Sequence, residues 1–550
     1  MKTATNRIEP LVRLRLEVDR LAVLVATAIF TVITVAVFAE GVDVPGGQAL
    51  LVLFPLGLVA ADALNPDNLI QRELRIAAAW SGMLLVAFWT VPWFLAFPLF
   101  AVGLPAALCA AALFAWRPAG AMVVLFLLTG VLGSFQAFLG FSPSLLVDLL
   151  IGALWLVFAA RIVLGRPYEF AIWPALLACA LYVAITVADL VTAEELNVAW
   201  LGFHTTIVYM LAVPAIAYAG WKREVYRRIA FGFVLVSALV CAYAVLRWVI
   251  GPAGAESELA MISGGGINVD PVDKSLRTVG SFQTAHTLAL WAGLMAPLCA
   301  AYALWGKGSR RLIAAAATAL CVLAAFASEA RGPLGGLVVG LVVVLALYQV
   351  SRAFPGFKLA AVGAGVAALL CIGGAGLALS ATSPERLERY TNILDPGDDP
   401  TYAQRVRKWE AVWGDVEKHP FGQGLGSGGQ AQTQAGRFVS ASDTDLDNSY
   451  LKVAFEQGLA VAALFVVAML MLFASLVRAA VLTRSREAAV IGIGAAGTMA
   501  SLLVSLWTGL YIETTAVLAG WMVIGLGLSY FVAREVSVPE DASSSPTPAH

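Results

Sequence analysis

Three arginines near the ends of apolar segments are the residues best suited to chemistry in this sequence. Arg247 lies near the end of one segment, Arg277 shortly precedes another, and Arg331 separates two long ones. A guanidinium binds phosphate oxygens through paired hydrogen bonds, so such arginines can hold a phosphate or diphosphate group. A snorkelling side chain or a local ion pair, for example between Arg331 and Glu329, is the alternative for each.

A long polar segment, from about Thr382 to Leu451, carries a second group of candidate residues. Arg405 could bind an anion, and Asp447 could accept a proton from a hydroxyl where the segment meets the next apolar run. The alternating acids Asp443, Asp445 and Asp447 could bind a divalent cation, or could simply form a solvated loop.

The elements that must hold these residues are membrane helices. Hydrophobic residues make up 60% of the chain and charged residues 13%, about half of the roughly 25% typical of soluble proteins. A spanning helix needs about 20 apolar residues, and the apolar runs, from Leu21–Ala39 onward, suffice for about 14 to 16 of them. The composition therefore predicts an all-α polytopic membrane protein. The formal net charge of −1 and the lack of a basic stripe exclude a nucleic-acid partner.

Positive charges give the expected orientation of these helices. If the N-terminus lies in the cytoplasm, nearly all arginines and lysines between apolar runs fall at alternate junctions on the cytoplasmic side. We expect both termini to lie there. The resulting organisation has a cytoplasmic N-terminus (1–20), an N-terminal bundle (21–250), an outer loop (251–280), further helices (281–381), a large outer loop (382–451), the C-terminal helices (452–533) and a disordered cytoplasmic tail (534–550).

The large outer loop contains a predicted amphipathic helix over 401–418. Val406, Trp409, Trp413 and Val416 recur there at the spacing of one helical face. This apolar face could pack the loop onto the helical bundle. Alternatively, it could lie in the membrane interface and shape the entrance for a lipid substrate.

Several short motifs occur in a fixed order between about residues 230 and 510. They are Arg277-Thr-Val-Gly-Ser-Phe282, Ala330-Arg-Gly332, Arg405 with Trp409, Pro420-Phe-Gly-Gln-Gly424, Asp447-Asn-Ser-Tyr-Leu451 and Glu456-Gln-Gly458. Together they resemble the O-antigen ligase and Wzy-type polysaccharide polymerase superfamily. In that family an arginine near a Ser-Arg-Gly motif precedes a large periplasmic loop. The loop ends in a His-Asn-x-Tyr-Leu motif, which is followed by Glu-x-Gly.

The resemblance implies glycosyl transfer at the periplasmic face of the bacterial inner membrane. The donor would be a glycan on undecaprenyl diphosphate. The acceptor would be a sugar hydroxyl, on lipid A-core in a ligase or on another lipid-linked repeat unit in a polymerase. Membrane lipids are expected partners, and a chain-length regulator is a further candidate partner. The known ligases are considered metal-independent, so we expect neither a metal nor another cofactor.

The resemblance and the residue chemistry together suggest roles at the site. Arg331 and Arg405 would stabilise the charge that develops on the leaving diphosphate, and Asp447 would act as a base or orient the acceptor. Glu456 lies about one turn into a helix, where an unpaired carboxylate is costly, so an arginine partner is expected. The expected catalytic residues are Asp447 and Arg331, and the expected substrate-binding residues are Arg405, Arg277, Arg247, Asn448, Glu456, His286 and His419.

The sequence departs from the family pattern at two positions. Ala330 replaces the serine of Ser-Arg-Gly, and Asp447 replaces the histidine that precedes asparagine in the ligases. Both imidazole and carboxylate can accept a proton, so transfer remains compatible with this change. The change favours a polymerase of exopolysaccharide, capsule or O-antigen over a lipopolysaccharide ligase. His286 and His419 could replace the missing histidine, or could be ordinary hydrogen-bonded residues.

A transporter or lipid-glycan flippase is the alternative of another class. Transporters place ionisable groups near the bilayer midplane and often contain paired repeats. Here Asp62, Asp189, Arg247 and Arg331 lie near the ends of predicted spans, and the sequence has no evident internal repeat. The large outer loop also favours chemistry at the membrane surface, so we favour glycosyl transfer.

Overall fold

The computed structural model describes residues 110–139, 144–163, 173–264, 268–269, 277–354, 400–431 and 446–532, with single-residue gaps inside these ranges. The predicted N-terminus and spans before residue 110, the predicted span at 358–381 and the predicted tail at 534–550 lie outside the described residues. All regular elements in the described part are helices, and nine helical segments there are long and apolar enough to cross a membrane. The all-α polytopic prediction is therefore confirmed.

The helices follow one another in a simple order. They are α5 (Pro118–Leu139), α6 (Ser144–Val163), α7 (Trp173–Val191), α8 (Leu196–Phe203), the π-helix η2 (His204–Val208), α9 (Ala212–Ala217), α10 (Arg223–Ile250), α11 (Gly254–Gly264), α12 (Ala285–Trp305), α13 (Gly308–Ala327), α14 (Arg331–Val350), α17 (Pro400–Lys418), α20 (Ser449–Gln457), α21 (Leu459–Leu482), α22 (Arg486–Thr508) and α23 (Thr515–Val532).

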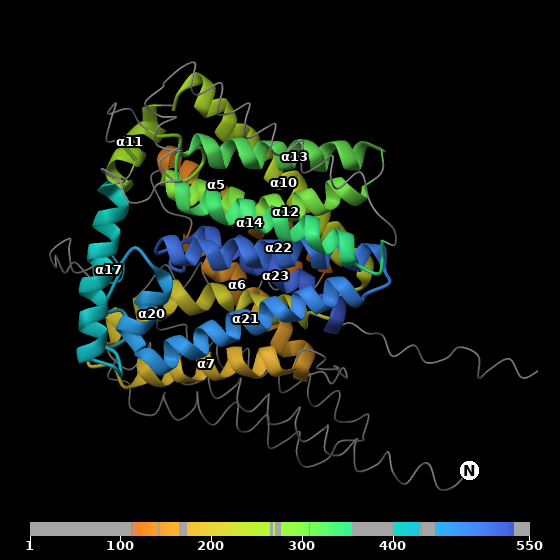
Figure 1. Ribbon diagram of the computed structural model, residues 1–550. Helices are drawn as coiled ribbons and strands as arrows, with labels where there is room; N and C mark the ends of the chain where they lie inside the picture. Colours follow the sequence, from red (N-terminus) through yellow and green to blue (C-terminus); the bar gives the residue numbers. More distant parts are fainter. Residues whose placement is uncertain are drawn as a thin grey trace, which may run out of the picture.

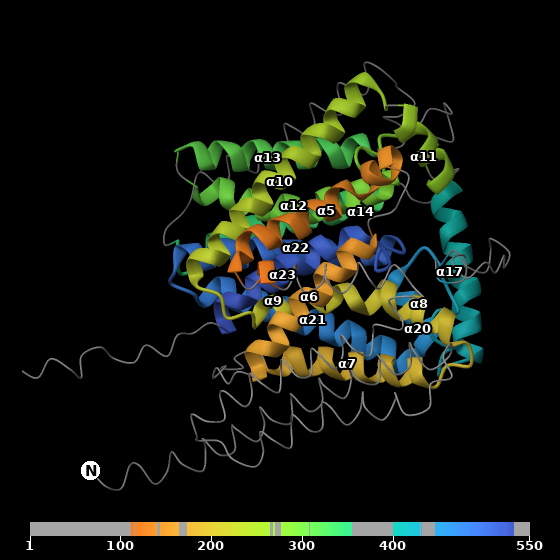
Figure 2. The ribbon, with the colours of Figure 1, turned by 180° about the vertical axis from the view of Figure 1, so that it is seen from behind.

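The long helices lie side by side in a bundle, and α17 crosses one end of it (Figure 1). The short helices α11 and α20 lie at the same end, which we call the α17 end (Figure 2). Many cations lie at the opposite end, in the connections between helices and in the first turns of the helices that follow. They are Arg223, Arg227, Arg228, Arg310, Arg311, Arg352, Arg484 and Arg486.

Helix α22 forms the centre of the bundle, where it packs against α12, α14, α21 and α23. Small residues allow this close approach. A Cβ atom added to Gly497 would lie 2.9 Å from the carbonyl oxygen of Gly340 on α14. The hydroxyls of Thr498 and Ser501 donate to backbone carbonyl oxygens of α12, at 2.8 and 3.1 Å. Close backbones and interhelical hydrogen bonds of this kind are the usual contacts between membrane helices.

The structure differs from the sequence interpretation at the entry to the C-terminal helices. The last long outer segment was expected to lead into a span at 452, whereas α21 begins at Leu459 and residues 449–457 form the separate helix α20. Gly458 joins the two helices with a φ of 89°, which only glycine adopts without strain. The chain therefore turns at Gly458, and α20 stays at the α17 end.

Candidate functional site

The C-terminal end of α22 is where the predicted site segments meet. Arg405 of α17 donates from Nη1 to the Thr508 carbonyl oxygen at 3.3 Å. The Ser449 hydroxyl at the start of α20 donates to the Gly509 carbonyl oxygen at 2.8 Å. A Cβ atom on Gly332, the second residue of α14, would clash with the Thr508 side chain. The starts of α14 and α20 and the second turn of α17 therefore converge on residues 508–509.

Arg405 and Asp447 form an ion pair at this convergence. The Nε atom of Arg405 lies 3.6 Å from Oδ2 of Asp447, and the two side chains are 29% and 26% exposed. A pair with this exposure is only weakly stabilising, so a ligand can open it at little cost. The carboxylate is thus accessible and lies beside a cation.

Asp447 has a strained backbone, since its φ of 44° falls in the left-handed region. Such a conformation costs about 1–3 kcal/mol in a residue other than glycine. The next two residues hold it in place. Asn448 is buried and caps α20, where its Oδ1 accepts from the backbone N–H groups of Tyr450 at 2.9 Å and Leu451 at 3.1 Å. Asn448 therefore supports the site by fixing the start of α20 directly after Asp447.

Glu456 is buried in an ionic cluster. The prediction that an arginine pairs with it is wrong, because its partner is Lys452. Its Oε2 atom pairs with Nζ of Lys452, one turn earlier on α20. The same ammonium lies 3.2 Å from Oε1 of Glu513, and all three side chains are fully buried. Lysine at the i−4 position satisfies the carboxylate from within the helix, so no arginine from another element is required.

Burial and neighbouring charges shift the pKa values of Lys452 and Glu456 in opposite directions. Burial raises the pKa of the Glu456 carboxyl, and the adjacent Lys452 ammonium offsets only part of that rise. Burial would lower the pKa of Lys452, but the carboxylates of Glu456 and Glu513 raise it above its usual range. The lysine therefore stays charged between two carboxyl groups.

The cluster also anchors the glycine-rich loop that follows α17. Oε1 of Glu456 accepts from the backbone N–H of Gly428 at 3.1 Å, and its carbonyl oxygen accepts from Gly424 N–H at 2.9 Å. A Cβ atom on Gly429 would lie 2.7 Å from Oε2 of Glu513. The glycines thus let the loop pass close to buried carboxyl groups.

Arg247 and Arg277 line a cavity of about 190 Å³ at the α17 end. Arg247 lies 2.9 Å from Oε2 of Glu256 and donates to the Tyr243 hydroxyl at 3.0 Å, so it forms a local pair. Glu329, close in sequence to Arg331, lines the same cavity and has a φ of 58°. The cavity thus contains two arginines and two acidic residues. Its lining comprises Arg247, Trp248, Gly251, Pro252, Glu256, Arg277, Thr278, Val279, Gly280 and Glu329.

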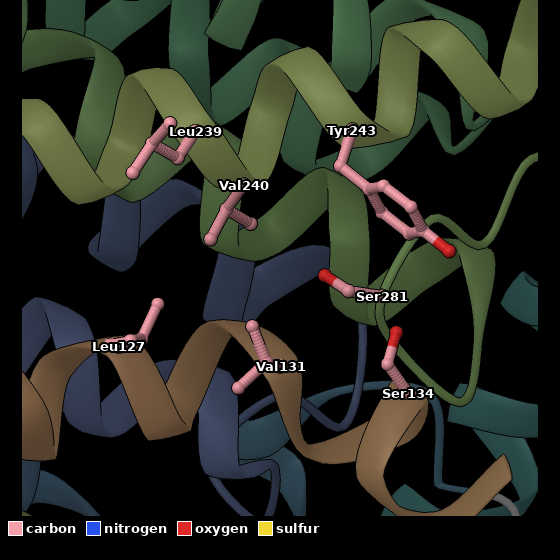
Figure 3. Close-up of a pocket in the computed structure, with 7 residues that line it drawn as sticks. All are labelled: Leu127, Val131, Ser134, Leu239, Val240, Tyr243 and Ser281. Carbon is pink, nitrogen blue, oxygen red and sulfur yellow. The ribbon is translucent and has the colours of Figure 1, made fainter. Parts of the chain in front are cut away.

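An apolar pocket of about 320 Å³ lies between α5 and α10 (Figure 3). Leu127 and Leu239 lie toward one side of it, and Ser134, Tyr243 and Ser281 lie toward the other (Figure 3). The Tyr243 hydroxyl also bonds the Glu256 carboxylate, so this residue lies at both the apolar pocket and the Arg247 pair. An apolar pocket beside a polar cavity suits a lipid with a polar head.

The two candidate histidines occupy different positions. His286 lies in the first turn of α12, which Thr284 caps by accepting from Thr287 N–H at 3.2 Å. His419 is exposed directly after α17, and its backbone N–H donates to the Asp415 carbonyl oxygen at 3.0 Å. Their proposed roles as replacements for the family histidine remain predictions.

Several residues of the site region were missed from the sequence. Lys452 could have been found, because its spacing to Glu456 is that of a helical ion pair. Tyr243 has the same i, i+4 spacing to Arg247 on α10. Glu513 and Glu256 could not have been found, since their partners lie on other elements.

The fold and site define a multi-pass membrane protein with ionic groups gathered at one end of its bundle. Residues 316–466 match the family model described as O-Antigen ligase, and this match confirms the resemblance to the O-antigen ligase and Wzy-type superfamily. The matched segment contains Arg331, Arg405, Asp447, Asn448 and Glu456. No curated protein and no solved structure matches the chain.

Proposed function

We propose that this protein is a glycosyltransferase that acts on undecaprenyl-diphosphate-linked glycan at the periplasmic face of the bacterial inner membrane. In this proposal it polymerises the repeat units of an exopolysaccharide, capsule or O-antigen. The observation that carries the proposal is the accessible Arg405–Asp447 pair. It lies within the segment that matches the ligase family and beside the start of α14, where Arg331 is found.

The proposed reaction forms one bond and breaks another at the anomeric carbon of the donor. The acceptor hydroxyl oxygen attacks this carbon, and its proton passes to the Asp447 carboxylate. The bond between the anomeric carbon and the diphosphate oxygen breaks, and its electron pair stays on the diphosphate. Arg331 and Arg405 stabilise this charge, because fixed cations act most strongly where charge develops in the transition state.

The apolar pocket and the neighbouring cavity support a lipid-linked donor. The pocket between α5 and α10 is lined mainly by aliphatic side chains and suits an isoprenoid chain. Tyr243 connects it to the cavity of Arg247 and Arg277, whose guanidinium groups can contact a diphosphate. The acidic residues Glu256 and Glu329 balance this charge, so Arg331 and Arg405 remain the main proposed diphosphate ligands.

Ligation of glycan to lipid A-core is the second candidate function. The description of the matching family favours it, whereas the aspartate at position 447, in place of the ligase histidine, favours polymerisation. Both reactions use the same donor chemistry and differ in the acceptor.

A deletion strain distinguishes these functions. We would profile the size of its surface and secreted glycans and extract its lipid-linked intermediates in parallel. A polymerase predicts single repeat units on the lipid carrier and no long chains. A ligase predicts long lipid-linked chains that never reach lipid A-core. Unchanged glycans and intermediates would contradict both functions.

A further inference from the structure

Three aromatic side chains beside the Arg405–Asp447 pair have no role in the reaction described above. Trp409 of α17 and Trp507 of α22 have ring centroids 5.9 Å apart at an interplanar angle of 66°. Tyr450 of α20 lies 6.4 Å from Trp507 at 46°. The aromatic cluster, Trp409, Tyr450 and Trp507, is therefore built from three separate elements that meet at the α17 end.

The Trp507 side chain is unusually exposed for a residue of the central helix. It is 56% exposed, although it lies in the last turn of the central helix α22, which is surrounded by α12, α14, α21 and α23. The helical face that carries Trp507 is contacted by α20, since the Tyr450 hydroxyl donates to the Leu503 carbonyl oxygen at 2.9 Å. Contacts with α17 and α20 place the ring near the site segments and not on an isolated flank of the bundle.

The cluster is held in a defined geometry. Trp409 packs against the core formed by α17 and α20, which includes Val412, Val416 and Phe455. Its buried Nε1 has no hydrogen-bond acceptor within the part of the chain that the structure describes. Rigid aromatic rings offer contact area at a small loss of side-chain entropy.

Polar groups that can bind hydroxyls adjoin these rings. Arg405 lies one turn before Trp409 on α17 and donates to the carbonyl oxygen of Thr508, the residue after Trp507. Asp447 lies shortly before Tyr450 and pairs with Arg405. A pyranose has an apolar face of C–H groups and a rim of hydroxyls. It can therefore stack on an aromatic ring, whose face is negative, while its rim meets charged groups.

We propose that the aromatic cluster is a sugar-binding subsite that stacks the acceptor sugar and presents its hydroxyl to Asp447. The inference rests on the proposed function and adds the residues that select the acceptor. Trp507 supplies the open face, and Trp409 and Tyr450 fix its position. Anchoring of Trp507 in lipid headgroups is the competing role, because tryptophan is common at membrane interfaces.

The test uses the free repeat-unit glycan, which mild acid releases from its lipid. Calorimetry measures its binding to the purified protein in nanodiscs. Trp507→Leu keeps apolar bulk without the aromatic face, and we expect it to weaken binding about tenfold or more. Trp507→Phe keeps the stack and should stay within about threefold of wild type. Trp413→Leu is the matched control, since Trp413 is 46% exposed on α17, outside the aromatic cluster, and its Nε1 donates to Glu417.

Equal affinities of Trp507→Leu and wild type would overturn the subsite. An equal loss in Trp507→Leu and Trp413→Leu would also overturn it and assign both residues to the membrane interface. If Trp507→Leu does not accumulate in the membrane, Trp409→Leu and Trp409→Phe provide the same comparison. The deletion strain separates the two proposals: loss of polymer there, together with normal glycan binding by Trp507→Leu, refutes the subsite alone. Unchanged polymer there refutes the proposed function.

Discussion

At the residue scale, Asp447 combines a left-handed backbone with a carboxylate that pairs with Arg405. Strain of this kind persists where the surrounding structure imposes it, and it is often found at functional sites. The Asn448 cap and the Ser449 hydroxyl impose it here. The orientation of the Asp447 carboxylate is thus fixed by the backbone of the residues that follow it.

This geometry allows charge and conformation to be tested separately at position 447. Asparagine tolerates the left-handed conformation but cannot take up a proton, so Asp447→Asn should lower the transfer rate about 100-fold or more with little change in stability. Asp447→Gly should relieve strain and raise the unfolding free energy by about 1 kcal/mol while also losing transfer. Reconstituted transfer assays and thermal unfolding measure the two effects.

Asp415→Asn is the control for this pair of variants. Asp415 lies on α17 and forms an exposed ion pair with Lys418 at 3.0 Å, so its loss should leave transfer unchanged. A wild-type rate in Asp447→Asn would show that the carboxylate is not the base.

The sequence motifs identified residues that lie close together in the structure. They did not show which residue each of them pairs with. Arg405 and Asp447 were recognised as separate candidates, and their pairing depends on the folding of α17 against the start of α20. The alternative of a local pair for Arg247 is what the structure contains, with Glu256 as its partner. Such pairs join segments with no common periodicity, so sequence spacing could not predict them.

At the element scale, α20 depends on the buried cluster of Lys452, Glu456 and Glu513. The pKa of Glu456 is raised by burial, so the folded protein binds this proton more tightly than the unfolded chain, whose carboxyl titrates near 4.5. Its contribution to stability is therefore present at low pH and is lost as the pH rises toward the raised pKa. Glu456→Gln removes this titration.

We therefore expect the stability of Glu456→Gln to rise relative to wild type as the pH increases above the unfolded value of 4.5, while loss of the partner of Lys452 lowers the variant's stability at every pH. Thermal unfolding of both proteins across this range measures the difference. Glu417→Gln, on the exposed face of α17, should follow the wild-type curve throughout. Parallel curves for Glu456→Gln and wild type would contradict a raised pKa at Glu456.

A second prediction at this scale concerns the junction between α20 and α21. Gly458 has a φ of 89°, and a Cβ atom there would lie 2.5 Å from the Pro420 carbonyl oxygen. Gly458→Ala should therefore lower the unfolding free energy by about 2–3 kcal/mol and reduce transfer by displacing α20. Gly414→Ala is the opposite case, because Gly414 lies inside α17 with open space around its Cα. It should stabilise the protein by up to about 1 kcal/mol. Equal melting temperatures for the two variants would contradict the role of Gly458.

The sequence predicted helix positions better than the turns between them. The stripe over 401–418 corresponds to α17 at Pro400–Lys418, where Val412 and Val416 face α20 and Trp413 faces outward. The apolar run that was expected to start at 452 has its first turns in α20 instead. Hydropathy averaged over a span did not reveal this break, because the long apolar run from Leu459 outweighs the two charged residues Lys452 and Glu456.

At the scale of the whole molecule, the two ends of the bundle differ in where their cations lie along the chain. The end opposite α17 carries arginines in its short connections and in the first turns of the adjoining helices, including Arg310, Arg311 and Arg484. Ion pairing does not distinguish the ends, since Arg227 pairs with Glu224 there just as Arg405 pairs with Asp447 at the α17 end. Cations of short connections gather on the cytoplasmic side of membrane proteins, so their position supports a periplasmic α17 end.

Cysteine labelling tests that orientation directly. Phe421 is 93% exposed at the α17 end, and Arg484 is exposed in the turn between α21 and α22 at the other end. Among the described native cysteines, Cys241, Cys299 and Cys321 are buried and Cys179 is partly buried. In intact cells whose outer membrane has been made permeable, an impermeant maleimide should label Phe421→Cys. It should label Arg484→Cys only after the inner membrane is opened. The unsubstituted protein sets the background from its own thiols. In the proposed reaction, donor glycans are consumed on the side where the ion pair of Arg405 and Asp447 is exposed. The reverse labelling pattern would therefore place the site in the cytoplasm and refute a periplasmic reaction.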